Sequence, residues 1–210
     1  MLSELKQACL IGSVALSGLF CVTPGFAADN DVAPTQIVQA DIAQKEPALW
    51  DAMRSGDHVA LLRHAIAPGS GDPAGFSVDD CATQRNLSDA GRDQARRIGS
   101  RFRENGIADA TVFSSQWCRC LETARLLGLG PVTAQPILNS FFRNFERGDS
   151  QTRMLRQWIA AQNLTTPLVL VTHQVNITAL TDVYPQSGEL VIVRLDKGGE
   201  LSVVGTIRTD

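Results

Sequence analysis

The chain has 210 residues, 44% of them hydrophobic, and a formal net charge of -3 at pH 7. This length and composition predict one ordinary globular domain. Lysine and arginine total 19 against 22 acidic residues, and no extended basic block occurs, so the chain lacks the charge pattern of a nucleic-acid-binding protein.

The first 28 residues have the pattern of a signal peptide. Lys6 precedes an apolar stretch over residues 8–22, and a proline and a small-residue exit at residues 25–28 follow it. An uncleaved anchor helix is the alternative, but the apolar run is shorter than the roughly 20 residues that span a bilayer. We therefore expect cleavage after Ala27 or Ala28 and no stable membrane insertion afterwards. The expected location is periplasmic or secreted, which is an oxidising compartment.

Removal of this segment leaves three cysteines, Cys81, Cys118 and Cys120. Cys118 and Cys120 are too close to pair with each other in a helix, because positions i and i+2 point to different sides. Either one can bridge to Cys81, and three buried or free thiols are the alternative. The spacing of His and Cys resembles no zinc-ligand set, so we expect no metal site.

After a polar N-terminal arm over residues 29–46, the domain over residues 47–210 shows alternating strand and helix patterns. The expected helices cover residues 48–54, 89–104, 117–127, 151–162 and 176–180, and the expected strands cover residues 58–63, 111–114, part of 129–137, 168–172, 189–195 and 200–207. Residues 65–83 form an unusually long loop, and such loops are usually functional. The alternation predicts an α/β fold, a three-layer sandwich with a largely parallel central sheet.

Two of the predicted strands stop on a histidine, at His64 and at His173. The carboxyl edge of a parallel sheet is where open α/β folds place their active sites. Taken singly, a histidine at a strand end is more often a hydrogen-bonded structural residue. Together they suit phosphoryl chemistry, with neutral His64 as the nucleophile and His173 as a donor to a phosphoryl oxygen.

Two arginines can supply the positive charge that a phosphoryl group needs. Arg63 directly precedes His64, and Arg119 lies near the amino end of a predicted helix, where the helix dipole and backbone donors also favour an anion. Cys118 directly precedes Arg119, so a bridge from Cys81 would pin the long loop against that helix. Cys118 is the better partner of Cys81 on this argument, because Cys120 would face another side of the helix.

Four blocks in order resemble the histidine phosphatase superfamily, which has the phosphoglycerate-mutase-like fold. The blocks are Leu61-Leu62-Arg63-His64-Ala65, the Asn86-Leu87-Ser88 to Gln94-Ala95 stretch, the Ser114-Ser115 to Thr123-Ala124 stretch with Arg119, and Val171-Thr172-His173. The resemblance implies a phosphohistidine intermediate on His64 and a phosphate pocket of Arg63, Arg119 and His173. It implies a small phosphorylated substrate and no cofactor.

The chain departs from the family pattern at the general acid. The mutase branch carries a Glu two residues after a Leu, but here Leu138 is followed by Asn139 and Ser140. The acid-phosphatase branch has Asp after its second His, where this chain has Gln174. Mutase activity is therefore not expected, and the general acid is unassigned. The candidate acids are Asp72, Asp79 and Asp80 in the long loop, and Glu146.

Two functions follow from these patterns. The first is an exported phosphatase that hydrolyses phosphomonoesters, and the alternative is a non-catalytic phosphate-binding or phosphosugar-binding protein of the same fold. The chain is also similar to the lipopolysaccharide core heptose phosphate phosphatases, which combine a signal segment, an Arg-His-Ala start and a nearby Cys. That finer resemblance implies an envelope phosphosugar as substrate.

Overall fold

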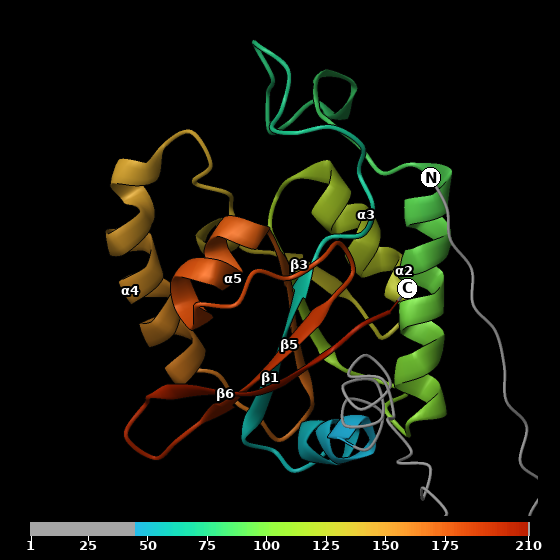
Figure 1. Ribbon diagram of the computed structural model, residues 1–210, viewed down its shortest axis with the longest axis vertical. Coiled ribbons are helices and arrows are strands. Elements are labelled where there is room, and N and C mark those ends of the chain that lie inside the picture. The colour runs from blue at the N-terminus through green and yellow to red at the C-terminus, as the bar shows by residue number, and fades with distance from the viewer. Residues whose placement is uncertain (1–44, 210) are drawn as a thin grey trace, which may run out of the picture. The chain divides into compact units, whose positions relative to one another are not determined.

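The computed structural model describes residues 45–209, shown in Figure 1. The predicted signal peptide and all but the last two residues of the predicted arm lie outside these residues. Residues 45–53 are helical. The strands that follow are β1 (His58–Arg63), β2 (Thr111–Ser114), β3 (Val132–Ala134), β4 (Leu168–Thr172), β5 (Leu190–Leu195) and β6 (Leu201–Ile207). The helices are α2 (Asp89–Glu104), α3 (Cys118–Leu127), α4 (Gly148–Ala160) and α5 (Gln174–Thr181), with short 3-10 turns η1 (Cys81–Thr83), η2 (Pro136–Leu138) and η3 (Phe145–Arg147).

The six strands form one sheet in the order β3-β2-β4-β1-β5-β6. The first four strands of that order pair in parallel, and β5 and β6 add an antiparallel edge. The prediction of a largely parallel sheet is therefore confirmed. The register pairs Arg63 of β1 with Thr172 of β4, so the histidines that follow these two residues leave neighbouring strands at the same level.

Helices cover both faces of the sheet, as Figure 1 shows with α2 and α3 on one side and α4 and α5 on the other. Side chains of β1 alternate between the two layers because successive strand residues point to opposite faces. Ala60 and Leu62 pack with the helix over residues 45–53, α2 and α3, whereas Val59 and Leu61 pack with α4 and α5. The three-layer prediction is confirmed by this division of the core.

Several element ends differ from those predicted. The first helix already includes residues 45–47, before the predicted start at residue 48. Helix α4 begins at Gly148, three residues before the predicted start at residue 151. No helix among residues 45–209 is both long and apolar enough to cross a membrane.

Candidate active site

The carboxyl edge of the parallel strands brings His64 and His173 together. Their ring centroids are 5.5 Å apart, and both side chains are buried. The register of β1 and β4 accounts for this contact, because each histidine is the first residue after its strand. Ser115 follows β2 in the same way and lies at the same edge. Three adjacent strands thus deliver three polar side chains to one place.

The ring of His64 is held in a single orientation. Its Nδ1 atom donates a hydrogen bond to the carbonyl of Ala65 at 2.8 Å. With the proton on Nδ1, the lone pair of the neutral ring is on Nε2, which lies 3.3 Å from Nε of Arg119. Burial, together with the charge of Arg119, lowers the pKa of His64 to about 3. His64 is therefore a neutral imidazole with its lone pair facing the arginine, as a nucleophile requires.

His173 contacts a second set of polar groups. Its Nε2 lies 2.9 Å from Oγ of Ser115, and its Nδ1 lies 3.4 Å from Nη2 of Arg119. The thiol of Cys120 also lies 3.5 Å from Nε2. Burial, followed by the charge of Arg119, lowers the pKa of His173 well below its ordinary value. His173 is therefore neutral at neutral pH and would have to take up a proton to act as a charged donor.

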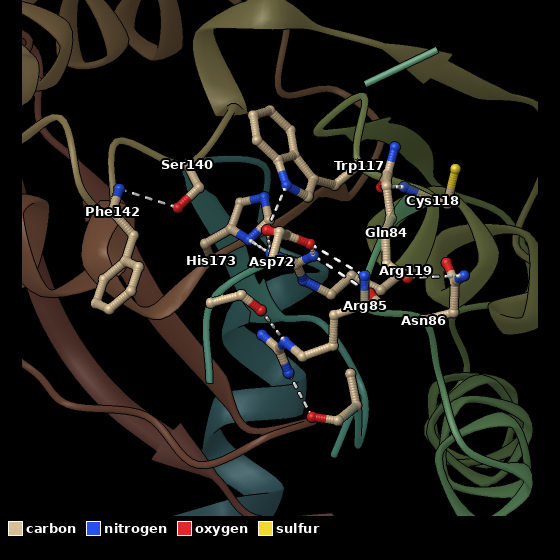
Figure 2. Close-up of polar contacts among 12 residues, drawn as sticks. Asp72, Gln84, Arg85, Asn86, Trp117, Cys118, Arg119, Ser140, Phe142 and His173 are labelled. Atoms are coloured by element: carbon tan, nitrogen blue, oxygen red, sulfur yellow. Dashed lines mark hydrogen bonds and ion pairs between the residues drawn. The ribbon is translucent and has the colours of Figure 1, made fainter. Parts of the chain in front are cut away.

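Arg119 stands between the two histidines on the first turn of α3, and its side chain is only 3% exposed. Figure 2 shows its guanidinium facing the carboxylate of Asp72, whose other neighbour is the indole of Trp117. Arg119 Nη1 donates to Asp72 Oδ1 at 2.7 Å and Nη2 donates to Oδ2 at 3.2 Å. Nη1 also donates to the carbonyl of Arg85 at 3.3 Å. All three guanidinium nitrogens of Arg119 therefore face protein acceptors.

Arg63 lines the same cavity and has a buried nitrogen without a hydrogen-bond partner among the described residues. Its Nη1 donates to the carbonyl of Pro185 at 2.8 Å, while its buried Nε has no hydrogen-bond partner. Burial, followed by the charge of Arg119, lowers the pKa of Arg63, although an arginine remains charged at neutral pH. A buried donor without a partner is costly, and an anion in the pocket would satisfy it.

Of the four candidate general acids, the structure brings only Asp72 to the pocket. Asp79 lines a separate cavity, Asp80 caps the η1 turn, and Glu146 is exposed on η3. Burial raises the pKa of Asp72, but hydrogen bonds and charge from Arg119 outweigh burial and hold this pKa below its usual range. Asp72 is therefore ionised at neutral pH and does not carry the proton that a general acid needs.

The loop between β1 and α2 is tied to the site at several points. A disulfide joins Cys81 in the loop to Cys118 at the start of α3, and Cys120 is the free, buried cysteine. Gln84 strengthens this link, because its Oε1 accepts from the backbone N–H of Cys118 at 3.0 Å. At the other end of the loop, a Cβ on Gly91 would lie 2.1 Å from the carbonyl of Ile66. Only glycine allows α2 to approach the chain so closely there.

The site opens into a cavity of about 350 Å³. Its lining includes side chains that local sequence patterns did not single out, namely Phe76, Arg85, Trp117, Phe142, Arg143 and Arg147. The sequence did not indicate these residues because they lie in loops and at helix ends, where no strand pattern marks a position at the sheet edge. Ser115, the partner of His173, was visible in the sequence only as part of a family block. Among residues 45–209, no group of three His, Cys, Asp or Glu side chains is arranged to hold a metal ion.

The family model of the histidine phosphatase superfamily (branch 1) matches residues 59–156. This range contains His64 and Arg119. Together with the fold, the match confirms the predicted resemblance. Residues 59–156 are similar to the histidine phosphatase superfamily. This similarity supports a phosphatase.

Solved structures of the same fold cover most of the chain. The protein histidine phosphatase SixA complexed with tungstate aligns with a TM-score of 0.56 at 17% identity, over 72% of this chain and 97% of that chain. A phosphoserine phosphatase mutant from Entamoeba histolytica aligns with a TM-score of 0.52 at 15% identity, over 73% and 98%. A mycobacterial glucosyl-3-phosphoglycerate phosphatase aligns with a TM-score of 0.53 at 14% identity, over 71% and 98%. These likenesses confirm the phosphoglycerate-mutase-like fold. No curated protein matches the sequence.

Proposed function

We propose that this protein is an exported phosphatase that hydrolyses phosphomonoesters through a phosphohistidine on His64. The observation that carries the proposal is the orientation of His64. The Nδ1–H of the ring is bound to the Ala65 carbonyl, and Nε2 faces the guanidinium of Arg119 inside a cavity. A buried neutral imidazole with its lone pair directed at a cationic pocket has the properties of a nucleophile for a phosphoryl group.

The reaction proceeds in two displacements at phosphorus. In the first, Nε2 of His64 forms a bond to phosphorus as the bond to the ester oxygen breaks, and that oxygen leaves as an anion that takes a proton from solvent to become the alcohol. In the second, a water oxygen forms a bond to phosphorus as the N–P bond breaks, which returns neutral His64 and releases inorganic phosphate. Arg63 and Arg119 stabilise the charge on the phosphoryl oxygens in both steps.

A phosphatase that acts on an unactivated ester needs a group that gives a proton to the leaving alcohol, whereas a phosphate-binding protein does not. Asp72, the one carboxylate that lines the cavity among the described residues, is paired with Arg119 and ionised. This observation favours the alternative of a non-catalytic phosphate-binding or phosphosugar-binding protein. An activated aryl phosphate needs little protonation of its leaving group, so it tests the nucleophile independently of the acid.

Export and substrate are parts of the same proposal. The predicted signal peptide and the Cys81–Cys118 disulfide both support an oxidising compartment, periplasmic or extracellular. The similarity to heptose phosphate phosphatases supports an envelope phosphosugar as substrate. Aromatic side chains in the cavity wall, Phe76, Trp117 and Phe142, suit the apolar face of a sugar ring.

The test is hydrolysis of p-nitrophenyl phosphate by the wild type and by two histidine variants. We expect His64→Ala to abolish hydrolysis, because in the proposed mechanism His64 alone forms the covalent bond to phosphorus. His58→Ala is the matched control, since His58 lies at the start of β1 and contacts Ser55 and Asp57 instead of the cavity. Wild-type rates in His64→Ala would exclude the covalent mechanism.

Rapid-quench kinetics then distinguish the phosphatase from the binding protein. A phosphatase should release a burst of p-nitrophenol and retain phosphate in an acid-labile, alkali-stable form that His64→Ala lacks. A binding protein would release no p-nitrophenol and would still bind inorganic phosphate. That result would replace the phosphatase proposal with the binding function.

A further inference from the structure

The cavity of the candidate site carries more positive charge than one phosphoryl group requires. Five arginines line it, against the single carboxylate of Asp72, and they are Arg63, Arg85, Arg119, Arg143 and Arg147. Their hydrogen bonds divide them into an inner group next to the histidines and an outer pair. We use "outer pair" for Arg143 and Arg147.

The inner arginines have identified partners or a clear role at His64. Arg119 is bound by Asp72, and Arg63, with its unpartnered Nε, lines the same cavity. Arg85 holds the loop, because its Nε donates to the carbonyl of Gly71 at 2.7 Å and its Nη1 donates to the carbonyl of Ala67. Its guanidinium is thus already occupied by backbone acceptors.

Among the described residues, the outer pair has neither a carboxylate partner nor a full set of backbone acceptors. Neither Arg143 nor Arg147 forms an ion pair with a carboxylate within residues 45–209. The one side-chain contact of the pair is a hydrogen bond from Arg143 Nη1 to the backbone carbonyl of Asp72 at 3.2 Å. Both guanidinium groups line the cavity from its exposed rim.

The backbone at Arg143 is also unusual. Its φ of 72° lies in the left-handed region, which residues other than glycine rarely adopt. Such conformations cluster at ligand sites, where the surrounding structure holds them. Across the gap, Gly71 has no Cβ, and an added Cβ would lie 2.9 Å from Nη2 of Arg143. Both features place the guanidinium of Arg143 against the loop that carries Asp72.

The guanidinium of Arg143 lies against Gly71 and Asp72, the loop residues that also accept hydrogen bonds from Arg85 and Arg119. Figure 2 shows Ser140 and Phe142 on one side of His173 and Arg85 and Arg119 on the other. Ser140 and Phe142 come just before Arg143 in the chain. Phe142 is 43% exposed and Phe76 is 37% exposed, so both line the mouth of the cavity. The part of a substrate beyond its reacting phosphate would therefore extend towards this mouth, which Arg143 and Arg147 also line.

We propose that Arg143 and Arg147 form a second anion subsite, so that the substrate carries another anionic group, a carboxylate or a second phosphate, beyond the phosphate that is cleaved. This proposal rests on the proposed function. A phosphate dianion and the carboxylate of Asp72 together carry fewer charges than the five arginines of the cavity, so positive charge remains for another anion. Two guanidinium groups with unused donors suit a carboxylate or phosphate, which accept hydrogen bonds through two oxygens at once.

The experiment compares two aryl phosphates that differ only in the second anion, phenyl phosphate and 3-carboxyphenyl phosphate. Their leaving groups have nearly the same acidity, so the chemical step is matched. We expect wild-type kcat/KM to favour the carboxylated substrate by about tenfold, the size of one charge-assisted hydrogen bond. Glucose 6-phosphate and glucose 1,6-bisphosphate form a second pair with a longer separation between the anionic groups.

Variants of the outer pair test whether Arg143 and Arg147 cause the preference for the carboxylated substrate. In Arg143→Gln and Arg147→Gln, the ratio of the two kcat/KM values should fall towards one, and Arg147→Lys should retain more of it than Arg147→Gln. Arg153→Gln is the control, because it removes the same charge from an exposed position on α4 outside the cavity. An equal kcat/KM for both members of each pair in the wild type, or a ratio that survives in the Gln variants, would overturn the proposal.

Salt dependence separates a direct contact from a general attraction of anions to the protein. A general attraction would disappear at about 0.5 M salt and would weaken equally in Arg153→Gln, whereas a direct contact keeps its preference. Loss of the preference at high salt, or an equal loss in Arg153→Gln, would overturn the proposal of a subsite. Calorimetry with phenylphosphonate and 3-carboxyphenylphosphonate measures the same ratio without turnover. Failure to hydrolyse phenyl phosphate would therefore count against the phosphatase, while the ratio of phosphonate affinities would still decide the subsite.

Discussion

The carboxylate of Asp72 binds both terminal nitrogens of Arg119, at 2.7 Å and 3.2 Å, in the centre of the candidate site. A guanidinium holds two phosphoryl oxygens through the same two-point geometry. If Arg119 binds a phosphoryl group in this way, as we propose, we expect the phosphate to displace Asp72. The Asp72–Arg119 pair links the long loop after β1 to the helix that presents the arginine.

Asp72→Asn should strengthen the binding of oxyanions. The substitution removes the negative charge that competes for Arg119, and one charged hydrogen bond corresponds to about tenfold in affinity. Competition by inorganic phosphate and by vanadate against an aryl phosphate measures the effect as a lower inhibition constant. Weaker inhibition in the variant would mean that Asp72 holds Arg119 in position for the anion instead of competing with it.

The same variant should be less stable when no anion is present. Arg119 would remain buried without its counter-ion, at a cost on the order of 1 to 3 kcal/mol. Thermal unfolding in phosphate-free buffer should show a lower midpoint than the wild type. Added phosphate should raise the midpoint of Asp72→Asn more than that of the wild type, since the ligand binds only the folded state. Equal phosphate-induced shifts would contradict this account.

Arg119→Lys should fail as a conservative change. An ammonium group is a point charge on a differently placed stem and cannot hold two phosphoryl oxygens as a guanidinium does. We expect kcat/KM for an aryl phosphate to fall by at least about tenfold, roughly 1.4 kcal/mol of transition-state binding. An unchanged value would remove Arg119 from the phosphate pocket.

His173→Ala should retain a small part of the activity that His64→Ala loses completely. His173 contacts Arg119 and Ser115 and stabilises charge without making a covalent bond, and loss of one preorganised donor commonly costs about 10²-fold to 10³-fold. Single-turnover rates with an aryl phosphate measure the difference. Complete loss in a well-folded His173→Ala protein would assign this residue a part in the bond-making step.

Protein stability should fall between pH 6.5 and pH 4 because of the two site histidines. The folded-state pKa of His64 is lowered to about 3, and that of His173 is lowered well below its ordinary value. The unfolded chain therefore binds more protons than the folded one below the ordinary histidine pKa of about 6.5, so the free energy of unfolding decreases as the pH falls. Each histidine contributes up to about 1.4 kcal/mol per pH unit in this range. His64→Gln should show a shallower decrease in urea titrations, and an identical slope would contradict the lowered pKa.

Reduction of the Cys81–Cys118 disulfide should destabilise the protein and loosen the loop. The bridge spans a sequence separation of 37, for which the loss is on the order of 3 to 4 kcal/mol. Peptide mapping without reduction should recover Cys81 linked to Cys118, with Cys120 as the free thiol of this trio. Three free thiols in protein purified from an oxidising compartment would exclude the bridge.

Local patterns were sufficient for much of the fold. The ends of the strands over residues 58–63 and 168–172 were predicted correctly, because buried parallel strands are nearly continuous apolar runs that stop at a polar residue. The start of α4 at Gly148 was missed, because its first turn is polar and follows an irregular segment. Helix ends depend on capping and on the packing of the preceding turn, which a short sequence window does not contain.

At the site, the residue types and the strand ends pointed to His64 and His173, because a residue that directly follows a buried parallel strand lies at the carboxyl edge of the sheet. Tertiary structure alone decided how these groups are arranged. The Ala65 carbonyl orients His64, Ser115 meets His173 from a third strand, and Asp72 reaches Arg119 across 47 positions of the chain. Local pattern encodes which residues lie at the sheet edge, whereas contacts between distant segments depend on register and loop packing, which only the folded chain specifies.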